Sequence, residues 1–249
     1  MISTDSRRVQ LQPAYVLHHR PYRDTSRILE LFTRDFGRVS VFARGARGGR
    51  KSAASLISML QPFNRLLLSW SAGAEAGQLT GAEFDGTVAA LAPERLVSGF
   101  YLNELLLKLV VRHDPHADVF ELYHGTIESL KNVPDPVRPL RIFEKRLLDA
   151  LGYGLALECD AVTGEPIDVG AAYQYRLEQG AVLAAGVVEG PLVFTGEVLR
   201  SLAREDLSDP ASCAGARRLL RAALDRVLEG RELKSRQVML ALRRTRTGA

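Results

Sequence analysis

Short segments in which apolar and polar residues alternate dominate the first third of the chain. Five of them have the length and period of strands, and they cover residues 14–17, 27–33, 38–43, 65–70 and 77–82. In the third, Val39, Val41 and Ala43 share one face and Arg38, Ser40 and Phe42 the other. Gly37, before this strand, suits a short hairpin connection that needs positive φ. A closed barrel removes exposed strand edges, so the pattern predicts a small five-stranded barrel of the OB type.

After residue 93 the apolar positions change to helical spacing. A long buried helix is expected in the segment from Leu96 to Val111. Further helices are expected at 119–130, 137–151, 197–204 and 214–228, whereas 153–193 loses the helical pattern and holds a strand at 173–177. We therefore predict an α+β protein. An OB-fold domain at 1–82 precedes a mostly helical domain at 83–244, with an irregular insert at about 153–193 and a disordered tail at 245–249.

Charge is distributed unevenly along these segments. Residues 1–82 carry twelve Lys/Arg and five Asp/Glu, and 231–249 carry six and one, whereas 83–230 carry fifteen and twenty-three. Clustered cations are typical of proteins that bind nucleic acid or acidic membranes, although a solvated basic face has the same composition. Residues 1–5 lack the apolar run of a signal peptide, and the two cysteines form no disulfide pattern. A cytoplasmic, nucleoid-associated protein is expected.

The most basic segment directly follows the third predicted strand. Between residues 44 and 51 it holds four cations, no acid and several glycines, which let a backbone approach a ligand closely. It also resembles a P-loop, because Gly45, Lys51 and Ser52 match that pattern. Arg50, however, stands where the second glycine is needed to form the phosphate cradle. Phosphate binding without nucleotide hydrolysis is the preferred interpretation, and a solvated loop and an atypical NTPase are the alternatives.

Several landmarks occur in the order typical of one protein family. They are a strand ending in Ala43-Arg44-Gly45-Ala46-Arg47, then Leu151-Gly152-Tyr153-Gly154, Cys159 with Thr163-Gly164-Glu165-Pro166, and Glu232-Leu233-Lys234-Ser235-Arg236 near the C-terminus. The chain resembles the RecO recombination mediators over nearly its whole length. No convincing catalytic Ser/His/Asp or Cys/His arrangement is present, so a non-enzymatic protein without a cofactor is expected. The resemblance implies a DNA-binding protein. It would bind single- and double-stranded DNA and anneal complementary strands.

The resemblance also implies partners. The first is RecR, with which a RecO protein helps to load RecA onto DNA coated by single-stranded DNA-binding protein. The second is the acidic C-terminal tail of that coating protein, and RecF is a further candidate. The expected DNA-binding residues are Arg34, Arg38, Arg44, Arg47, Arg50, Lys51, Arg243 and Arg244. A generic OB-fold protein for RNA or single strands is the alternative function.

The sequence suggests two further kinds of site, one for a peptide and one for a metal. Arg138, Arg141 and Lys145 on one predicted helix could receive an acidic peptide, although an amphipathic helix docked on its own domain with exposed cations is the favoured interpretation. The resemblance implies that a four-cysteine zinc site occurs in the insert of many members of the family. Here Cys159 remains but Val162 stands at its partner position, so we expect a degenerate zinc-ribbon-like insert without metal, and a buried Cys159. His113, His116 and His124 have no fixed metal-ligand spacing, so no metal is expected there either.

Overall fold

The computed structural model describes residues 8–23, 26–44, 56–71, 73, 76–86, 90–186 and 190–247, with the backbone alone for 243–247. The chain divides into two compact units, which we call unit 1 (Met1–Asn132 with Leu233–Ala249) and unit 2 (Val133–Glu232). This division differs from the expected boundary after residue 82, because the first helices after the barrel pack on the barrel itself.

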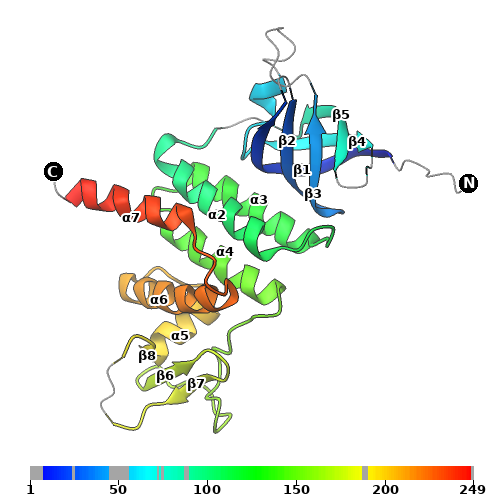
Figure 1. The fold of residues 1–249 in the computed structure, drawn as a ribbon. Coiled ribbons are helices and arrows are strands. Elements are labelled where there is room, and N and C mark those ends of the chain that lie inside the picture. The colour runs from blue at the N-terminus through cyan, green and yellow to red at the C-terminus, as the bar shows by residue number, and fades with distance from the viewer. Residues whose placement is uncertain are drawn as a thin grey trace, which may run out of the picture. The chain divides into compact units, whose positions relative to one another are not determined.

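Unit 1 begins with the five expected strands. They are β1 (Arg8–Tyr22), β2 (Ser26–Thr33), β3 (Gly37–Ala43), β4 (Arg65–Ser71) and β5 (Gly77–Phe84), and they close into a barrel in the order β1-β2-β3-β5-β4 (Figure 1). Only β3 and β5 pair in parallel. The predicted α+β class and its N-terminal five-stranded barrel are confirmed.

The β2–β3 hairpin turns at the glycine that the sequence indicated. Gly37 has φ +62°, and a Cβ at this position would lie 2.1 Å from the carbonyl oxygen of Asp114. Any larger residue would therefore combine backbone strain with a clash. The turn is also closed by Thr33, whose Oγ1 donates to the Gly37 carbonyl at 2.7 Å.

Strand β1 is much longer than its apolar centre predicted. It pairs with both β2 and β4, and its register shifts between Val9 and Gln12 and again between Val16 and His18. Leu11, at the first shift, has φ 47° and donates its backbone N–H to Ser69 Oγ at 3.0 Å. Such bulges bend a strand enough to follow a closed barrel, and they hide its length from a strict period-two reading.

The barrel interior is apolar. Val39, Val41 and Ala43, which were predicted to share one face, all point inward and pack with residues of the other strands such as Leu29 and Trp70. Trp70 is the sole tryptophan and is 5% exposed. It is therefore a natural fluorescence reporter for this unit.

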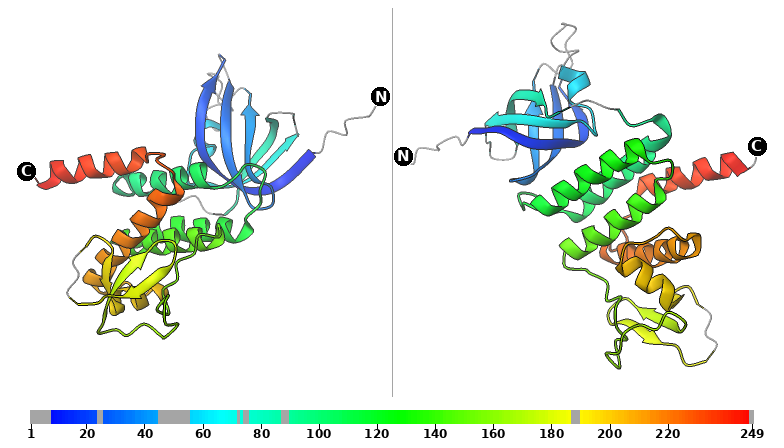
Figure 2. Two further views of the ribbon diagram at one scale, coloured as in Figure 1. Left: turned by 60° about the horizontal axis from the view of Figure 1, so that its bottom comes forward. Right: turned by 180° about the vertical axis from the view of Figure 1, so that it is seen from behind.

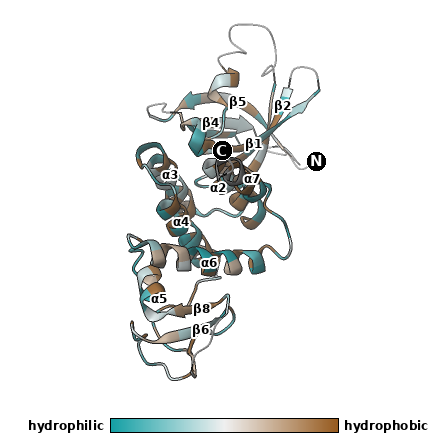
Figure 3. Ribbon diagram, turned by 90° about the vertical axis from the view of Figure 1, so that its left-hand side faces the viewer, coloured by the Kyte–Doolittle hydropathy of each residue, from teal (hydrophilic) through white to brown (hydrophobic). Residues whose placement is uncertain are grey.

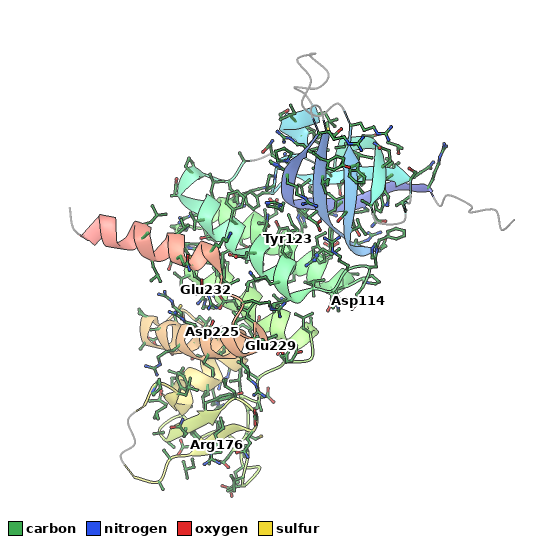
Figure 4. The ribbon with its side chains drawn as sticks, in the orientation of Figure 1. Asp114, Tyr123, Arg176, Asp225, Glu229 and Glu232 are labelled. Atoms are coloured by element: carbon green, nitrogen blue, oxygen red, sulfur yellow. The ribbon has the colours of Figure 1, made fainter. Side chains whose placement is uncertain are left out.

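One outer face of the barrel is covered by helices. After η1 (Pro93–Arg95) come α2 (Leu96–Leu109) and α3 (Ala117–Asn132), which lie beside one another (Figures 1 and 2). Tyr123 of α3, labelled in Figure 4, contacts Tyr15 of β1 with ring centroids 4.9 Å apart. Buried Asn103 of α2 donates to the Leu17 carbonyl at 2.8 Å and accepts from the Tyr123 hydroxyl at 2.6 Å. These contacts fix α2 and α3 to β1.

The C-terminal landmark 232–236 starts helix α7 (Lys234–Thr247). Glu104 of α2 accepts hydrogen bonds from the backbone N–H groups of Lys234 and Ser235, both at 2.9 Å, and from Ser235 Oγ at 2.6 Å. A carboxylate here satisfies N–H groups that a helix start leaves unpaired. The landmark thus has a structural role in unit 1. The backbone of residues 245–247, which were expected in a disordered tail, is helical, and residues 248–249 lie outside the description.

Unit 2 contains α4 (Val137–Ala150), a sheet in the order β7-β6-β8, and two further helices. The strands are β6 (Ala172–Arg176), β7 (Gly180–Leu183) and β8 (Val193–Thr195), and the helices are α5 (Gly196–Ala203) and α6 (Pro210–Val227). Hydrophobic and hydrophilic segments mix along the helices of this unit, as expected of amphipathic elements (Figure 3). No helix among the described residues is both long and apolar enough to cross a membrane.

The expected buried position of Cys159 is wrong, because Cys159 is exposed. Its neighbour Asp160 is the residue that points inward and holds the insert. The Asp160 carboxylate accepts backbone N–H groups from Thr163 at 2.9 Å, Val162 at 2.8 Å and Leu183 at 2.6 Å. These bonds, that from Thr163 first, hold the pKa of Asp160 below its usual value. A hydrogen-bonded carboxylate thus organises the turn after Cys159.

Candidate nucleic-acid interface

Arg34 and Arg38, two of the predicted phosphate contacts, flank the β2–β3 hairpin and already have partners. The Arg34 guanidinium makes two hydrogen bonds to Asp35, at 3.0 and 3.2 Å, and holds the pKa of that carboxyl below its usual value. Arg38 donates through Nη1 to the carbonyl groups of Leu106, Leu107 and Val110 at the end of α2. Burial lowers the pKa of Arg38, although an arginine stays charged at neutral pH.

Two other arginines of unit 1 are similarly engaged by acids. Arg65 of β4 pairs with Asp85 at 2.7 Å, and Arg112 donates to both carboxylate oxygens of Glu30 at 2.7 Å. The negative carboxylates cancel much of the potential that these guanidinium groups would offer to a phosphate. The barrel surface near the hairpin and α2 is therefore a poor candidate for binding an anion.

The opposite end of β1, β2 and β3 differs in three of its arginines, which are exposed. Since these strands are antiparallel, the end of β1, the start of β2 and the end of β3 meet at one end of the barrel. Arg20, Arg23 and Arg44 lie there and are all exposed, and we call them the end cluster. Across the described part of the chain, no Asp or Glu lies within 4.0 Å of their guanidinium nitrogens. Three guanidinium groups without carboxylate partners can bind a polyanion.

The end cluster overlaps only partly with the prediction. Arg44 was expected, whereas Arg20 and Arg23 at the end of β1 were missed, because only the pairing of β1, β2 and β3 brings them to the same barrel end as Arg44. Arg47, Arg50 and Lys51, with the P-loop-like pattern at 45–52, lie outside the described residues. The backbone of Arg243 and Arg244 belongs to α7, and their side chains are likewise outside the description.

The cations expected to receive a peptide lie together on α4, but they already contact acidic residues of unit 2. Arg141 is buried and pairs with buried Glu144 at 2.5 Å. Lys145 contacts Asp149 at 3.1 Å and Glu205 at 3.3 Å, and Arg138 donates to the Glu205 carbonyl at 3.4 Å. This arrangement favours the simpler interpretation, in which α4 is an amphipathic helix docked in unit 2.

The three histidines do not come together. His124 Nδ1 on α3 lies 2.7 Å from the hydroxyl of Tyr15 on β1. His116 Nε2 lies 3.2 Å from an Asp114 carboxylate oxygen. Within the described ranges, no group of three or more His, Cys, Asp or Glu could hold a metal ion. The histidines therefore have roles in packing and local hydrogen bonding.

Comparison with known proteins gives a consistent result along the chain. The family model described as "Recombination protein O N terminal" matches residues 8–87, and "Recombination protein O C terminal" matches 91–237. A DNA repair protein RecO from Nitrosococcus oceani is 47% identical over 238 residues, which covers 95% of each chain. One from Alkalilimnicola ehrlichii is 48% identical over 241 residues, covering 96% of this chain and 94% of that protein. One from Coxiella burnetii is 40% identical over 234 residues, covering 94% and 99% respectively.

Proposed function

Because the chain belongs to the RecO family of DNA repair proteins, we propose that it binds the DNA backbone through its barrel and anneals complementary strands without catalysis. The observation that carries the proposal is the end cluster, in which Arg20, Arg23 and Arg44 are exposed at one end of the barrel and have no Asp or Glu within 4.0 Å among the described residues. Neutralising phosphates releases counterions from DNA, so this grip is independent of sequence and weakens with salt.

Annealing follows from the same physics. Two complementary strands repel each other, and a cationic surface that screens this repulsion brings them within pairing distance. No bond in the DNA is made or broken, so no general acid, nucleophile or metal is required. In repair, the protein would act with RecR to load RecA onto strands coated by single-stranded DNA-binding protein, with RecF as a further candidate partner.

The acidic tail of the coating protein is the second proposed ligand. Among the three α4 cations considered for it, Arg138 is exposed, whereas Arg141 and Lys145 already contact carboxylates. A peptide carboxylate would reach Arg138 without displacing an existing ion pair. We therefore place the first contact there and give Arg141 a structural role.

The experiment is an annealing assay with two complementary oligonucleotides that carry a fluorophore and a quencher, without nucleotide or metal. The account predicts faster quenching with the protein than without it. A need for ATP would favour the NTPase alternative. Activity confined to RNA strands would favour the generic RNA-binding alternative. Absence of acceleration in a protein that binds both strands would contradict annealing.

A further inference from the structure

Two aromatic side chains lie at the same barrel end as the end cluster. Tyr22 of β1 and Phe42 of β3 contact each other with ring centroids 5.1 Å apart and an interplanar angle of 49°. They come from the two strands that flank β2, and neither ring is buried: Tyr22 is exposed and Phe42 partly exposed. Together they form a small aromatic patch on the outer surface of the barrel.

Cations surround this patch. The guanidinium carbon of Arg23 lies 5.3 Å from the centre of the Tyr22 ring. Strand register places Arg20 opposite Ile28 and Ile28 opposite Phe42, so Arg20 and Phe42 occupy one row across three strands on the same face. Arg44 follows Phe42 by two residues. Aromatic rings are thus interleaved with the cations proposed to hold phosphates.

Other aromatic residues of the barrel are placed differently. Tyr15 and Phe32 share the outer face of β1 and β2 but are fully buried against Phe120 and Tyr123 of α3. Phe36, at the hairpin, is 41% exposed and packs edge-on against Trp70, but it neighbours Arg34, which is paired with Asp35. Phe84 of β5 is also 39% exposed, but the adjacent Asp85 pairs with Arg65. In the end-cluster region, by contrast, open rings lie near arginines that have no Asp or Glu within 4.0 Å among the described residues.

We propose that Tyr22 and Phe42 form a base-stacking site for single-stranded DNA, with Arg20, Arg23 and Arg44 holding the flanking phosphates. This inference rests on the proposed DNA binding and adds that the site distinguishes single-stranded from duplex DNA. A nucleobase of any sequence can stack on an aromatic ring, but only an unpaired base can leave its own stack to do so. Duplex DNA would bind to the same arginines without reaching the rings.

The test compares wild-type protein with the double variant Tyr22→Leu and Phe42→Leu, which keeps apolar side chains at both positions and removes the aromatic faces. Phe36→Leu is the matched control, because it removes an equally exposed ring from the other end of the strands. Binding to a labelled single strand and to a duplex of equal length is followed by anisotropy over a range of salt concentrations. Trp70 fluorescence verifies that each barrel is folded.

The double variant is expected to bind the single strand about tenfold more weakly, while duplex binding changes less than about twofold. The slope of log affinity against log salt should not change, because no phosphate contact is removed. Equal losses for both DNAs, or no loss for either, would overturn the stacking site. Absence of DNA binding by the wild-type protein would instead refute the proposed function itself, so the two failures are distinguishable.

A second measurement does not depend on variant stability. A single strand containing 5-bromodeoxyuridine is irradiated in the complex, and the cross-linked residue is identified by mass spectrometry. The proposal predicts cross-links at Tyr22 or Phe42. Efficient cross-links confined to other parts of the chain would overturn it.

Discussion

Replacing Arg38 with methionine removes a guanidinium group from the end of α2 while keeping an apolar stem of similar length. The Nη1 group faces three carbonyl groups at the end of α2, those of Leu106, Leu107 and Val110. The Leu106 carbonyl also accepts the Val110 N–H, whereas the other two lie where the helix ends and its carbonyls need partners from outside the helix. The variant would therefore leave the α2 terminus uncapped where it meets β3.

The magnitude follows from the contacts. A hydrogen bond from a charged donor contributes about 1.5–3 kcal/mol, and a cation at a helix C-terminus adds about 0.3–1 kcal/mol. The buried Nε of Arg38 has no hydrogen-bond partner, which offsets part of this gain. We expect Arg38→Met to lower the free energy of unfolding of unit 1 by about 2–3 kcal/mol.

The assay is urea unfolding followed by the fluorescence of Trp70, which reports on the barrel alone. With a denaturant slope of about 2 kcal/mol per molar, the midpoint should fall by about 1–1.5 M. Arg34→Met on the same hairpin is the control, and its exposed pair with Asp35 predicts a change below about 1 kcal/mol. DNA affinity of Arg38→Met, measured where it is folded, should equal that of wild type. Unchanged stability with weakened DNA binding would refute this reasoning and return Arg38 to the phosphate contacts.

Three further predictions concern buried and exposed polar groups. Asn103→Leu should destabilise unit 1 by about 2–4 kcal/mol in the same Trp70 assay, because the buried Tyr123 hydroxyl loses its hydrogen bond to Asn103. A loss below about 1 kcal/mol would contradict a stabilising role for this hydrogen bond. The lowered pKa of Asp160 means that its stabilising effect is present above the usual carboxyl pKa and is lost as pH falls through the lower folded value. Amide hydrogen exchange at Val162 should then accelerate, relative to the intrinsic rate, on acidification, and an Asp160→Asn variant should lack this dependence. Exposed Cys159 should react with a thiol reagent in the native protein, and Cys159→Ser should change stability by less than about 0.5 kcal/mol; protection from the reagent would contradict its exposed position.

The elements that could be predicted are those specified by local patterns. Alternation in 38–43 identified the strand and the residues that share a face, and the structure shows that the face with Val39, Val41 and Ala43 points to the barrel core. Gly37 marked the hairpin because its backbone requirement is local. Strand β1 was predicted too short, because two bulges interrupt its period.

The site was harder to predict because its partners are distant in sequence. Nothing near Arg38 indicates that the end of α2, about 70 residues later, brings carbonyl groups to its guanidinium. Arg20 and Arg23 lie far from Arg44 in the sequence, and the antiparallel pairing of β1, β2 and β3 brings all three to the same end of the barrel. Cys159 was expected inside by residue type alone, whereas the backbone hydrogen bonds of Asp160 determine which side chain turns inward.

The central claim, that the end cluster holds DNA phosphates, is tested most directly by salt-dependent binding of a charge-reduced variant. Arg20, Arg23 and Arg44 are replaced together by glutamine. The control replaces three exposed arginines that are paired with acids, Arg34, Arg221 and Arg226, and so removes the same net charge. Binding to labelled single-stranded DNA is measured between about 50 and 200 mM salt.

If each arginine of the end cluster neutralises one phosphate, its triple variant should lose about two units from the magnitude of the log–log salt slope, at about 0.7 per phosphate. The control should retain the wild-type slope. Equal slopes for wild type and the end-cluster variant, or an equal reduction in the control, would contradict the claim. Net charge rather than these three residues would then account for any DNA binding.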